Sequence, residues 1–211
     1  ETFLLDEQRL PYLLEQFKKT SEFDQRAPWI LKPSLLNNGA GIKIIESSSA
    51  LQQHYCSPQR YLGTHVLQQY ICPPHLLREY KYSIRMFVVI TNTSGVFLYR
   101  QGYFNIARCV YRSSDLSSLE RHLTNEHLPS ESDQPHHQIP SSCHPCFDQV
   151  YPGLRSITQA VIEAFRQKQS ALFSGSYRVP ALGLFGFDFM IDAALRPWLL
   201  EVNHGPCVPT D

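Results

Sequence analysis

Hydrophobic and polar residues alternate along several stretches of the chain, which is the pattern of strands with one buried face. The longest stretch, YKYSIRMFVVIT at residues 80–91, is followed by an NTSG turn and a second apolar stretch at 95–111. Shorter stretches predict strands at 28–34, 35–45 and 65–71, the first two joined as a hairpin. We therefore expect mainly antiparallel strand pairs.

Helical spacing is found in fewer places. An amphipathic helix is predicted over 154–172, because apolar residues recur there at helical intervals, namely Leu154, Ile157, Val161, Phe165 and Leu172. We also expect a helical segment over 3–19, broken near Pro11, and a serine-capped helix over 48–55. The polar segment 129–150 predicts a mobile loop. Antiparallel strands with helices laid on one side indicate the α+β class.

Two apolar stretches near the end of the sequence, FGFDFMID and WLLEVNHGP, each carry a carboxylate inside a strand-like pattern. A hairpin closed by the four-residue loop 193–196 pairs Asp192 with Pro197 and sets Asp188 opposite Glu201. Because side chains alternate between faces along a strand, the apolar residues then face a core together. They are Phe187, Phe189, Ile191, Trp198, Leu200 and Val202.

Asp188, Glu201 and Asn203 share the opposite face of this predicted hairpin. Like charges directly opposite each other in a sheet repel, whereas oxygen-bearing side chains gathered on one patch suit a hard cation. Mg²⁺ prefers such ligands and usually shares itself with substrate phosphates. We therefore predict a metal site here. The alternative is a solvated polar face, and a register slip of one residue would separate the three side chains.

The segment KPSLLNNGAGI predicts a site for an anion. Gly39 and Gly41 allow backbone N–H groups to turn toward a phosphate, and Lys32 on the preceding strand is able to reach the same group. A plain hairpin turn explains the two glycines equally well.

Two cations on the strand 80–91 extend this pattern. Lys81 and Arg85 lie four residues apart and share one strand face with Ser83. Buried cations on a sheet face are costly unless they are paired, so we interpret them as part of a polyphosphate site. The alternative is a pair of ordinary edge-strand charges.

Composition excludes several classes of protein. Lys+Arg and Asp+Glu each number 19, which argues against a general nucleic-acid binder. No apolar run approaches the length of a membrane span, and the charged N-terminal residues do not resemble a signal peptide, so a cytoplasmic protein is expected. Six cysteines do not make a disulfide scaffold in 211 residues. Because the sequence opens on Glu1, we expect a fragment of a longer protein.

The segment HHQIPSSCHPC leaves several interpretations open. Cys143 and Cys146 lie close to His136 and His137, which is compatible with a zinc site or a redox pair. A flexible insertion without such chemistry is the simplest alternative, because there is no second CxxC motif.

The order of the motifs WILKPS, GAGI, VLQQYI, KYSIRMFVVIT, HLTN, LFGFDFMID and WLLEVNHGPC resembles the tubulin tyrosine ligase and ligase-like family over about residues 28–208. The resemblance implies an ATP-grasp fold, with ATP held between subdomains of about 1–71 and 72–211, and a family N-terminal domain that lies upstream. It implies ATP and Mg²⁺ as cofactors. It also implies that a free amino acid is joined to a protein acceptor, such as a tubulin tail, through an acyl phosphate.

The resemblance assigns the nucleotide to residues in several motifs. Lys32 resembles the phosphate lysine of the family, and Lys81 resembles the lysine near the base. The family hinge that reads adenine through its backbone corresponds to Gln68, Gln69, Tyr70 and Ile71. Thr124 and Asn125 of HLTN resemble the loop on the ribose side.

The same resemblance assigns the reacting end of the site. Arg85 resembles the arginine on the terminal phosphate, and we expect Arg85 and Glu201 to be catalytic. Asp188, Glu201 and Asn203 resemble the Mg²⁺ ligands, in agreement with the hairpin register predicted above.

Some positions depart from the family pattern. Ser83 stands where the family has aspartate, Asn105 where it has arginine, and Asn38 where it has a basic residue before the first glycine. Arg100 and Arg108 are nearby and are hypothesised to replace the missing arginine. Two alternatives to an active protein ligase therefore stay open. One is an impaired nucleotide- or tubulin-binding module of the same fold, and the other is a small-molecule ligase.

Overall fold

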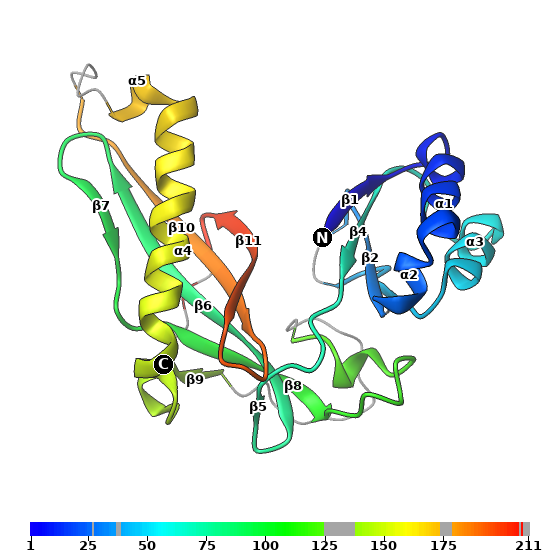
Figure 1. The fold of residues 1–211 in the computed structure, drawn as a ribbon. Coiled ribbons are helices and arrows are strands. Elements are labelled where there is room, and N and C mark those ends of the chain that lie inside the picture. The colour runs from blue at the N-terminus through cyan, green and yellow to red at the C-terminus, as the bar shows by residue number, and fades with distance from the viewer. Residues whose placement is uncertain (27, 37–38, 125–137, 174–178, 207, 209–211) are drawn as a thin grey trace. The chain divides into compact units, whose positions relative to one another are not determined.

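The computed structural model describes residues 1–26, 28–36, 39–124, 138–173, 179–206 and 208 (Figure 1). The chain divides into two compact units. Unit 1 comprises Glu1–Cys72 and Tyr111–Asp133, and unit 2 comprises Pro73–Val110 and Gln134–Asp211. Each unit has its own sheet and its own hydrophobic core.

Unit 1 is built on a four-stranded antiparallel sheet in the order β1-β4-β2-β3. Its strands are β1 Thr2–Leu5, β2 Trp29–Pro33, β3 Lys43–Ile45 and β4 His65–Gln69. Its helices are α1 Arg9–Thr20, α2 Glu22–Gln25 and α3 Ser48–Cys56, and a 3-10 turn spans Leu119–Arg121. The three α-helices lie on one side of the sheet (Figure 1).

Alternation along β2 separates the two faces of this sheet. Trp29 points to the helices, where its ring stacks on Phe23 at 5.0 Å and its Nε1 donates a hydrogen bond to the Phe23 carbonyl. Ile30 belongs to the other face and packs with Tyr70 and Leu123. Lys32 follows Ile30 on that second face, away from the helix-covered core.

Several predictions for unit 1 are confirmed, and one is wrong. The hairpin of β2 and β3 is confirmed, as is α3, whose N-cap Ser47 side chain accepts a hydrogen bond from the Ala50 N–H. The expected helix over 3–19 begins only at Arg9, because residues 2–5 pair with β4 as an edge strand. Pro11 does not break the helix, since it lies in the first turn, where its missing N–H has no intrahelical partner to lose.

We predict that the stability of unit 1 falls between neutral and mildly acidic pH because of His54. Burial, together with the neighbouring Lys43, His65 and Arg60, lowers the pKa of His54 from its ordinary 6.5 to about 4. The unfolded chain therefore binds a proton before the folded chain does, so stability is complete above pH 6.5 and decreases as the pH falls toward 4. Urea unfolding midpoints at several pH values measure this loss. It should be smaller in His54→Gln, and identical pH profiles for the two proteins would contradict the assignment.

Unit 2 contains a seven-stranded sheet in the order β11-β10-β6-β8-β9, with β5 and β7 also paired to β6. Its strands are β5 Leu76–Leu77, β6 Tyr80–Thr91, β7 Gly95–Leu98, β8 Tyr103–Val110, β9 Gln138–Pro140, β10 Leu182–Ile191 and β11 Pro197–His204. Its helices are α4 Phe147–Lys168 and α5 Ser170–Phe173, and a 3-10 turn spans Ser141–Cys143. The long helix α4 lies along the sheet (Figure 1).

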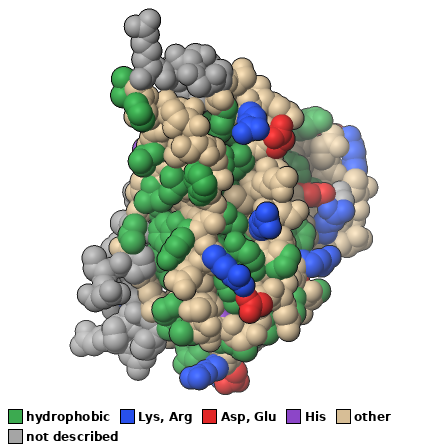
Figure 2. Space-filling model, turned by 90° about the vertical axis from the view of Figure 1, so that its left-hand side faces the viewer, with side chains coloured by type: hydrophobic (Ala, Val, Ile, Leu, Met, Phe, Trp, Pro, Cys, Tyr) green, Lys and Arg blue, Asp and Glu red, His purple; other side chains and the backbone are tan. Residues whose placement is uncertain are grey.

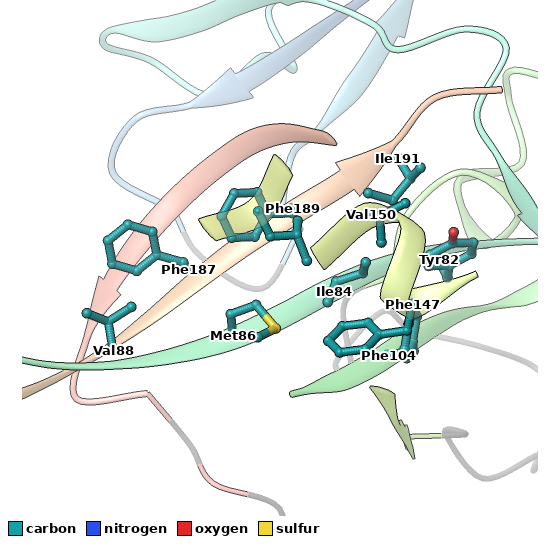
Figure 3. Packing of buried hydrophobic residues seen from close by; sticks show 11 residues of the cluster. Tyr82, Ile84, Met86, Val88, Phe104, Phe147, Val150, Phe187, Phe189 and Ile191 are labelled. Carbon is teal, nitrogen blue, oxygen red and sulfur yellow. The ribbon is translucent and has the colours of Figure 1, made fainter. Parts of the chain in front are cut away.

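The core of unit 2 lies between this sheet and α4. Alternate residues of β6, including Ile84, Met86 and Val88, are fully buried against Val150 and Leu154 of the helix. Phe187 and Phe189 of β10 extend the same layer (Figure 3). The intervening residues of β6 therefore project from the opposite face, and they include Lys81, Ser83 and Arg85.

The predictions from the sequence pattern are wrong for two segments of unit 2. The apolar stretch 95–111 is not one strand but two, because the chain leaves β6 after β7 and returns as β8. The return passes so close to β6 that a Cβ on Gly102 would lie 2.1 Å from the Arg85 carbonyl oxygen. The expected mobile loop over 129–150 is wrong for its described part, which forms β9, a 3-10 turn and the start of α4 at Phe147. Residues 129–137 of that prediction lie outside the described residues.

Hydrophobic side chains gather on the side of unit 2 that carries β7 (Figure 2). The large apolar side chains exposed on this unit include Phe97 within β7, Tyr99 directly after it and Leu182 at the start of β10. Within the described ranges, no helix combines the length and the apolar character needed to cross a membrane.

Candidate functional site

The hairpin of β10 and β11 places Asp188 directly opposite Glu201, which confirms the predicted pairing. The predicted closing pair is wrong, because Pro197 pairs with Ile191 and not with Asp192. The pairing register shifts by one residue at a β-bulge opposite Asp188 and Phe189, where Leu200 is the extra residue of β11. The turn is therefore one residue longer than expected, and the register at the carboxylates is unchanged.

Asp192 organises this longer turn. Its carboxylate accepts hydrogen bonds from the backbone N–H groups of Ala194 and Arg196 at 2.9 and 3.0 Å. It also accepts bonds from Arg196 Nε at 2.8 Å and Trp198 Nε1 at 3.0 Å. Because of the bulge, Leu199 pairs with Phe189 and packs on the core, whereas Trp198 pairs with Met190 on the other face and is 46% exposed. The predicted apolar face of β11 is therefore wrong at Trp198 and at Leu200, the extra residue of the bulge, and Val202 opposite Phe187 is 41% exposed and does not join the core.

Four side chains form one row across the face of the sheet that lies away from α4. Glu201 pairs with Asp188, Asp188 with Arg85, and Arg85 with Tyr103, each on a neighbouring strand. Cross-strand partners share a sheet face, so β11, β10, β6 and β8 each contribute one polar side chain to the row.

A bidentate ion pair lies at the centre of the row. Arg85 Nε donates to Asp188 Oδ1 at 2.7 Å, and Nη2 donates to Oδ2 at 2.5 Å. Arg85 Nη1 also donates to the Tyr103 hydroxyl at 3.4 Å. Burial raises the pKa of Asp188, and the guanidinium opposes this by favouring the ionised carboxylate. The hydrogen bonds to Asp188 in turn raise the pKa of Arg85.

The Asn203 amide joins the two carboxylates of the hairpin. Its Nδ2 donates to Asp188 Oδ2 at 3.0 Å and to Glu201 Oε1 at 3.1 Å. The positive end of an amide dipole thus lies where two carboxylate oxygens converge, a position that suits a cation. Two carboxylates and one amide fit Mg²⁺ in donor chemistry, because Mg²⁺ takes oxygen ligands. In the part of the chain that the structure describes, no three His, Cys, Asp or Glu side chains gather to hold a metal.

Two departures from the family pattern are neighbours in the sheet. Ser83 of β6 pairs with Asn105 of β8, and Asn105 pairs with Gln138 of β9. Gln138 Nε2 donates to Asn105 Oδ1 at 3.2 Å. Aspartate and arginine at the first two positions would face each other as an ion pair, so their joint replacement by serine and asparagine leaves no charge without a counter-charge.

The arginines hypothesised to replace the missing one are engaged elsewhere. Arg100 Nη2 lies 3.3 Å from the Asp148 carboxylate, and its guanidinium lies over the Tyr151 ring, so it contacts α4. Arg108 lines a pocket together with Ile106 and His144. Lys81 is placed as expected on the face of Arg85 and is 2% exposed.

The remaining predicted ligands belong to unit 1. Lys32 Nζ donates to Gln68 Oε1 at 3.0 Å on the sheet face away from the helices. Gly39 and Gly41 both have the positive φ angles, 78° and 69°, that a glycine turn requires. Thr124 follows Leu123, which packs with Ile30. Asn38 and Asn125 lie outside the described residues.

Part of the backbone of the predicted hinge, Gln68–Ile71, is already hydrogen-bonded within unit 1. The N–H of Gln69 donates to the Glu1 carbonyl, and the N–H of Tyr70 donates to the Pro28 carbonyl. Reading of a base by this backbone would therefore fall to its other groups.

Sequence reasoning missed two buried polar residues beside the predicted ones. His122 is 1% exposed, and its Nε2 donates to the Asp115 carbonyl, so its Nδ1 accepts from the Tyr70 hydroxyl at 2.9 Å. Tyr103 is 5% exposed and completes the row. For Tyr103 a signal existed, because GYFNIARCV alternates and would place Tyr103 and Asn105 on one face.

Of the cysteine segment, only residues 138–146 are described, and within them no group of metal ligands forms. Cys143 is exposed and Cys146 is partly buried, and both are free thiols. His136 and His137, the other ligands considered, lie outside the described residues.

Comparison with known proteins places this architecture in one family. The family model for the tubulin-tyrosine ligase family matches residues 1–211. The probable tubulin polyglutamylase TTLL2 of Mus musculus is 28% identical over 225 residues, covering 100% of this chain and 40% of that protein.

Two further relatives differ in their named activities. Tubulin glycylase 3D of Tetrahymena thermophila is 28% identical over 193 residues, covering 84% of this chain and 18% of that protein. Tubulin monoglutamylase TTLL4 of Homo sapiens is 26% identical over 223 residues, covering 93% of this chain and 18% of that protein. The chain spans less than half the length of these curated relatives. The predicted α+β, ATP-grasp class is confirmed by the family match and the antiparallel sheets, and the chain belongs to the tubulin-tyrosine ligase family.

Proposed function

We propose that this chain carries the ATP-dependent ligase centre of a cytoplasmic enzyme that adds an amino acid to a tubulin-like acidic tail. The row Glu201–Asp188–Arg85 with Asn203 is the observation that carries the proposal. It supplies two carboxylates, an amide and a guanidinium on one sheet face, which is the chemistry required to hold a metal-bound triphosphate. The relatives named as tubulin polyglutamylase, monoglutamylase and glycylase support a ligase acting on tubulin.

Each residue of the row has a proposed role. Asp188, Glu201 and Asn203 would hold Mg²⁺, which on binding would neutralise charge on the phosphates. Arg85 would bind the terminal phosphate through N–H groups of the guanidinium, while Asp188 keeps its planar fork oriented. Lys81, buried on the same face, adds a second positive charge.

The proposed reaction joins a carboxylate to an amine in two steps. A carboxylate oxygen of the acceptor attacks the γ-phosphorus of ATP, the bond from that phosphorus to the bridging oxygen breaks, and ADP leaves. The amine nitrogen of the amino acid then attacks the acyl carbon, phosphate leaves, and the nitrogen loses a proton. Arg85 stabilises charge on the phosphoryl group in the first step, and no enzyme nucleophile is required.

We assign the nucleotide residues of unit 1 in the same proposal. Lys32 binds phosphate, Gly39 and Gly41 present backbone N–H groups to it, and Thr124 contacts the ribose, with Asn125 as the second residue of that loop. Gln68, Gln69, Tyr70 and Ile71 form the adenine contact. We further propose that units 1 and 2 correspond to the two ATP-grasp subdomains.

A second function is favoured by the neutral pair Ser83 and Asn105. A protein with fewer charges beside Arg85 binds the nucleotide or tubulin but transfers phosphate poorly. The two functions are separated by incubating full-length protein with tubulin, ATP, Mg²⁺ and a mixture of amino acids, followed by mass spectrometry of the tubulin tails. Added amino-acid masses that require ATP support the ligase. Nucleotide binding without any added mass supports the binding module.

We predict that Mg²⁺–ATP raises the unfolding temperature of the full-length protein. Ligand at about 100 times its Kd stabilises the folded state by about 2.7 kcal/mol, which corresponds to about 5–10 °C for a domain of this size. Differential scanning calorimetry with and without Mg²⁺–ATP measures the shift. The variant Lys32→Met should reduce it, whereas Lys18→Met, on the exposed face of α1, should leave it unchanged. No shift in the wild-type protein would remove both nucleotide-dependent functions.

A further inference from the structure

The chain that follows β8 leaves unit 2 and folds as part of unit 1. Residues 111–124 belong to unit 1, and they end at Thr124, the residue assigned above to the ribose. Within the described ranges this segment adds no strand to the unit 1 sheet. Its place beside the sheet therefore depends on side-chain contacts, and these contacts decide where Thr124 lies.

Apolar packing keeps the segment on the sheet face that carries Lys32. Leu119 and Leu123 belong to the same cluster as Ile30 and Tyr70. Ile30 lies on the face away from the three α-helices, two residues before Lys32. Apolar burial has no preferred direction, so this packing holds the segment close to the sheet without fixing its orientation.

The segment is also folded on itself around Asp115. The Asp115 carboxylate accepts hydrogen bonds from Ser117 Oγ at 3.0 Å and from Arg121 Nε at 2.9 Å. The Asp115 carbonyl accepts a hydrogen bond from His122 Nε2 at 2.8 Å. When Nε2 carries the proton of the neutral ring, Nδ1 is an acceptor. The segment therefore presents a fixed acceptor nitrogen.

Tyr70 supplies the donor for this nitrogen. Its hydroxyl donates to His122 Nδ1 at 2.9 Å, and the two side chains are only 6% and 1% exposed. Burial raises the pKa of Tyr70, so the hydroxyl keeps its proton. The two rings also meet edge to face, with centroids 5.9 Å apart. Unlike the apolar packing, this hydrogen bond has a direction, and it joins the predicted hinge to the segment.

We propose that His122 is a positioning residue for the nucleotide. Through Tyr70 it fixes the hinge, which contacts the adenine, relative to Thr124, which lies two residues after His122 and contacts the ribose. Gln68 lies two residues before Tyr70 and accepts a hydrogen bond from Lys32 Nζ, so the phosphate lysine is tied to the same hinge. The inference rests on the nucleotide site proposed above and names the residue that organises it.

The variant Tyr70→Phe tests the hydrogen bond alone, because it removes the hydroxyl and keeps the ring. We expect about a tenth of the molecules to retain the binding orientation, which weakens the binding of Mg²⁺–ATP about tenfold. Isothermal titration of the full-length protein measures the Kd. The KM for ATP should rise by the same factor, while kcat at saturating ATP stays within about twofold of the wild-type value. A merely structural role would instead lower kcat through loss of active protein and leave the KM unchanged.

Three further variants locate the effect. Tyr55→Phe is the matched control, since Tyr55 is 8% exposed on the helix-covered side of unit 1 and its hydroxyl donates to the Leu5 carbonyl. It should bind Mg²⁺–ATP as the wild type does. His122→Ala should weaken binding at least tenfold, and His122→Asn should recover most of this loss, because its Oδ1 takes the place of Nδ1 as an acceptor. The recovery should disappear when His122→Asn is combined with Tyr70→Phe.

The outcomes separate this inference from the proposed function. Equal Kd values for the wild type and Tyr70→Phe would overturn the positioning role and leave the nucleotide site standing, as would a lower kcat with an unchanged KM. A wild-type protein that does not bind Mg²⁺–ATP would overturn the nucleotide site itself, and the inference with it. If Tyr70→Phe does not fold, as judged by its circular dichroism spectrum, the two His122 variants decide, and equal Kd values for them would overturn the inference.

Discussion

Glutamine in place of Glu201 is expected to lower the rate of amino-acid incorporation by about 10²–10³-fold, the loss typical of removing one strong electrostatic contact to a transition state. Glu201 is exposed and contributes a charge to the row through its position opposite Asp188. Glutamine keeps its shape and still accepts a hydrogen bond from Asn203, but it removes the negative charge that a metal ion requires. The free energy of unfolding should stay within about 0.5 kcal/mol of the wild-type value.

Incorporation rates at saturating ATP and tubulin measure this effect, and urea unfolding measures stability in the same preparations. Glu163→Gln on α4 makes the same chemical change at an exposed position away from the row and should have no effect on either measurement. Undiminished incorporation by the Glu201 variant would remove Glu201 from the proposed metal site. A large loss of stability would instead mean that the residue acts through folding.

Removal of Asp188 is expected to destabilise unit 2 by about 3 kcal/mol, because it leaves the Arg85 guanidinium buried without a counter-charge. The two side chains are only 17% and 10% exposed, so water replaces little of the lost interaction. Asp188→Ala should therefore show a lower urea midpoint as well as the loss of ligation. The double variant Arg85→Met, Asp188→Leu removes both charges and should recover most of the stability, since a buried apolar pair of similar volume is not penalised by desolvation.

The double variant separates folding from function. It should be stable and yet inactive, because the proposed phosphate and metal contacts are both gone. Activity in the double variant would contradict the role of the pair in the reaction. A double variant no more stable than Asp188→Ala would mean that the ion pair is not the cause of the lost stability.

The long periodic elements of this fold were predictable from the sequence, and the short ones were not. The strand 80–91 matches β6 in full, because twelve residues of alternation leave little ambiguity. Residues 2–5 form a strand only because they pair with β4, and their own local sequence does not predict that pairing. The composition of segment 138–150 predicted a loop. The segment instead pairs with β8 through β9, and the Ser141 hydroxyl accepts a hydrogen bond from the Gly102 N–H.

The residues that share the candidate site were predictable from the sequence, whereas the contacts between them were not. Alternation along three strands suffices to bring Lys81, Arg85, Asp188 and Glu201 to one face. The direct pairing of Arg85 with Asp188 depends on the register between β6 and β10, which are separated by about half of the chain. No local pattern specifies such a register, so the ion pair and the Tyr103 contact emerge only from the folded sheet.

The bulge at Leu200 has a consequence for solubility. β11 is the last strand in the sheet order, so one side of its backbone has no strand partner among the described residues. A regular apolar edge strand is a template onto which a second molecule adds its own strand, which begins aggregation. The bulge breaks the regular spacing of the exposed N–H and C=O groups, and the adjacent carboxylate of Glu201 repels a like-charged copy of the same edge. One extra residue therefore keeps the carboxylates in register and also opposes the addition of a strand from a second molecule.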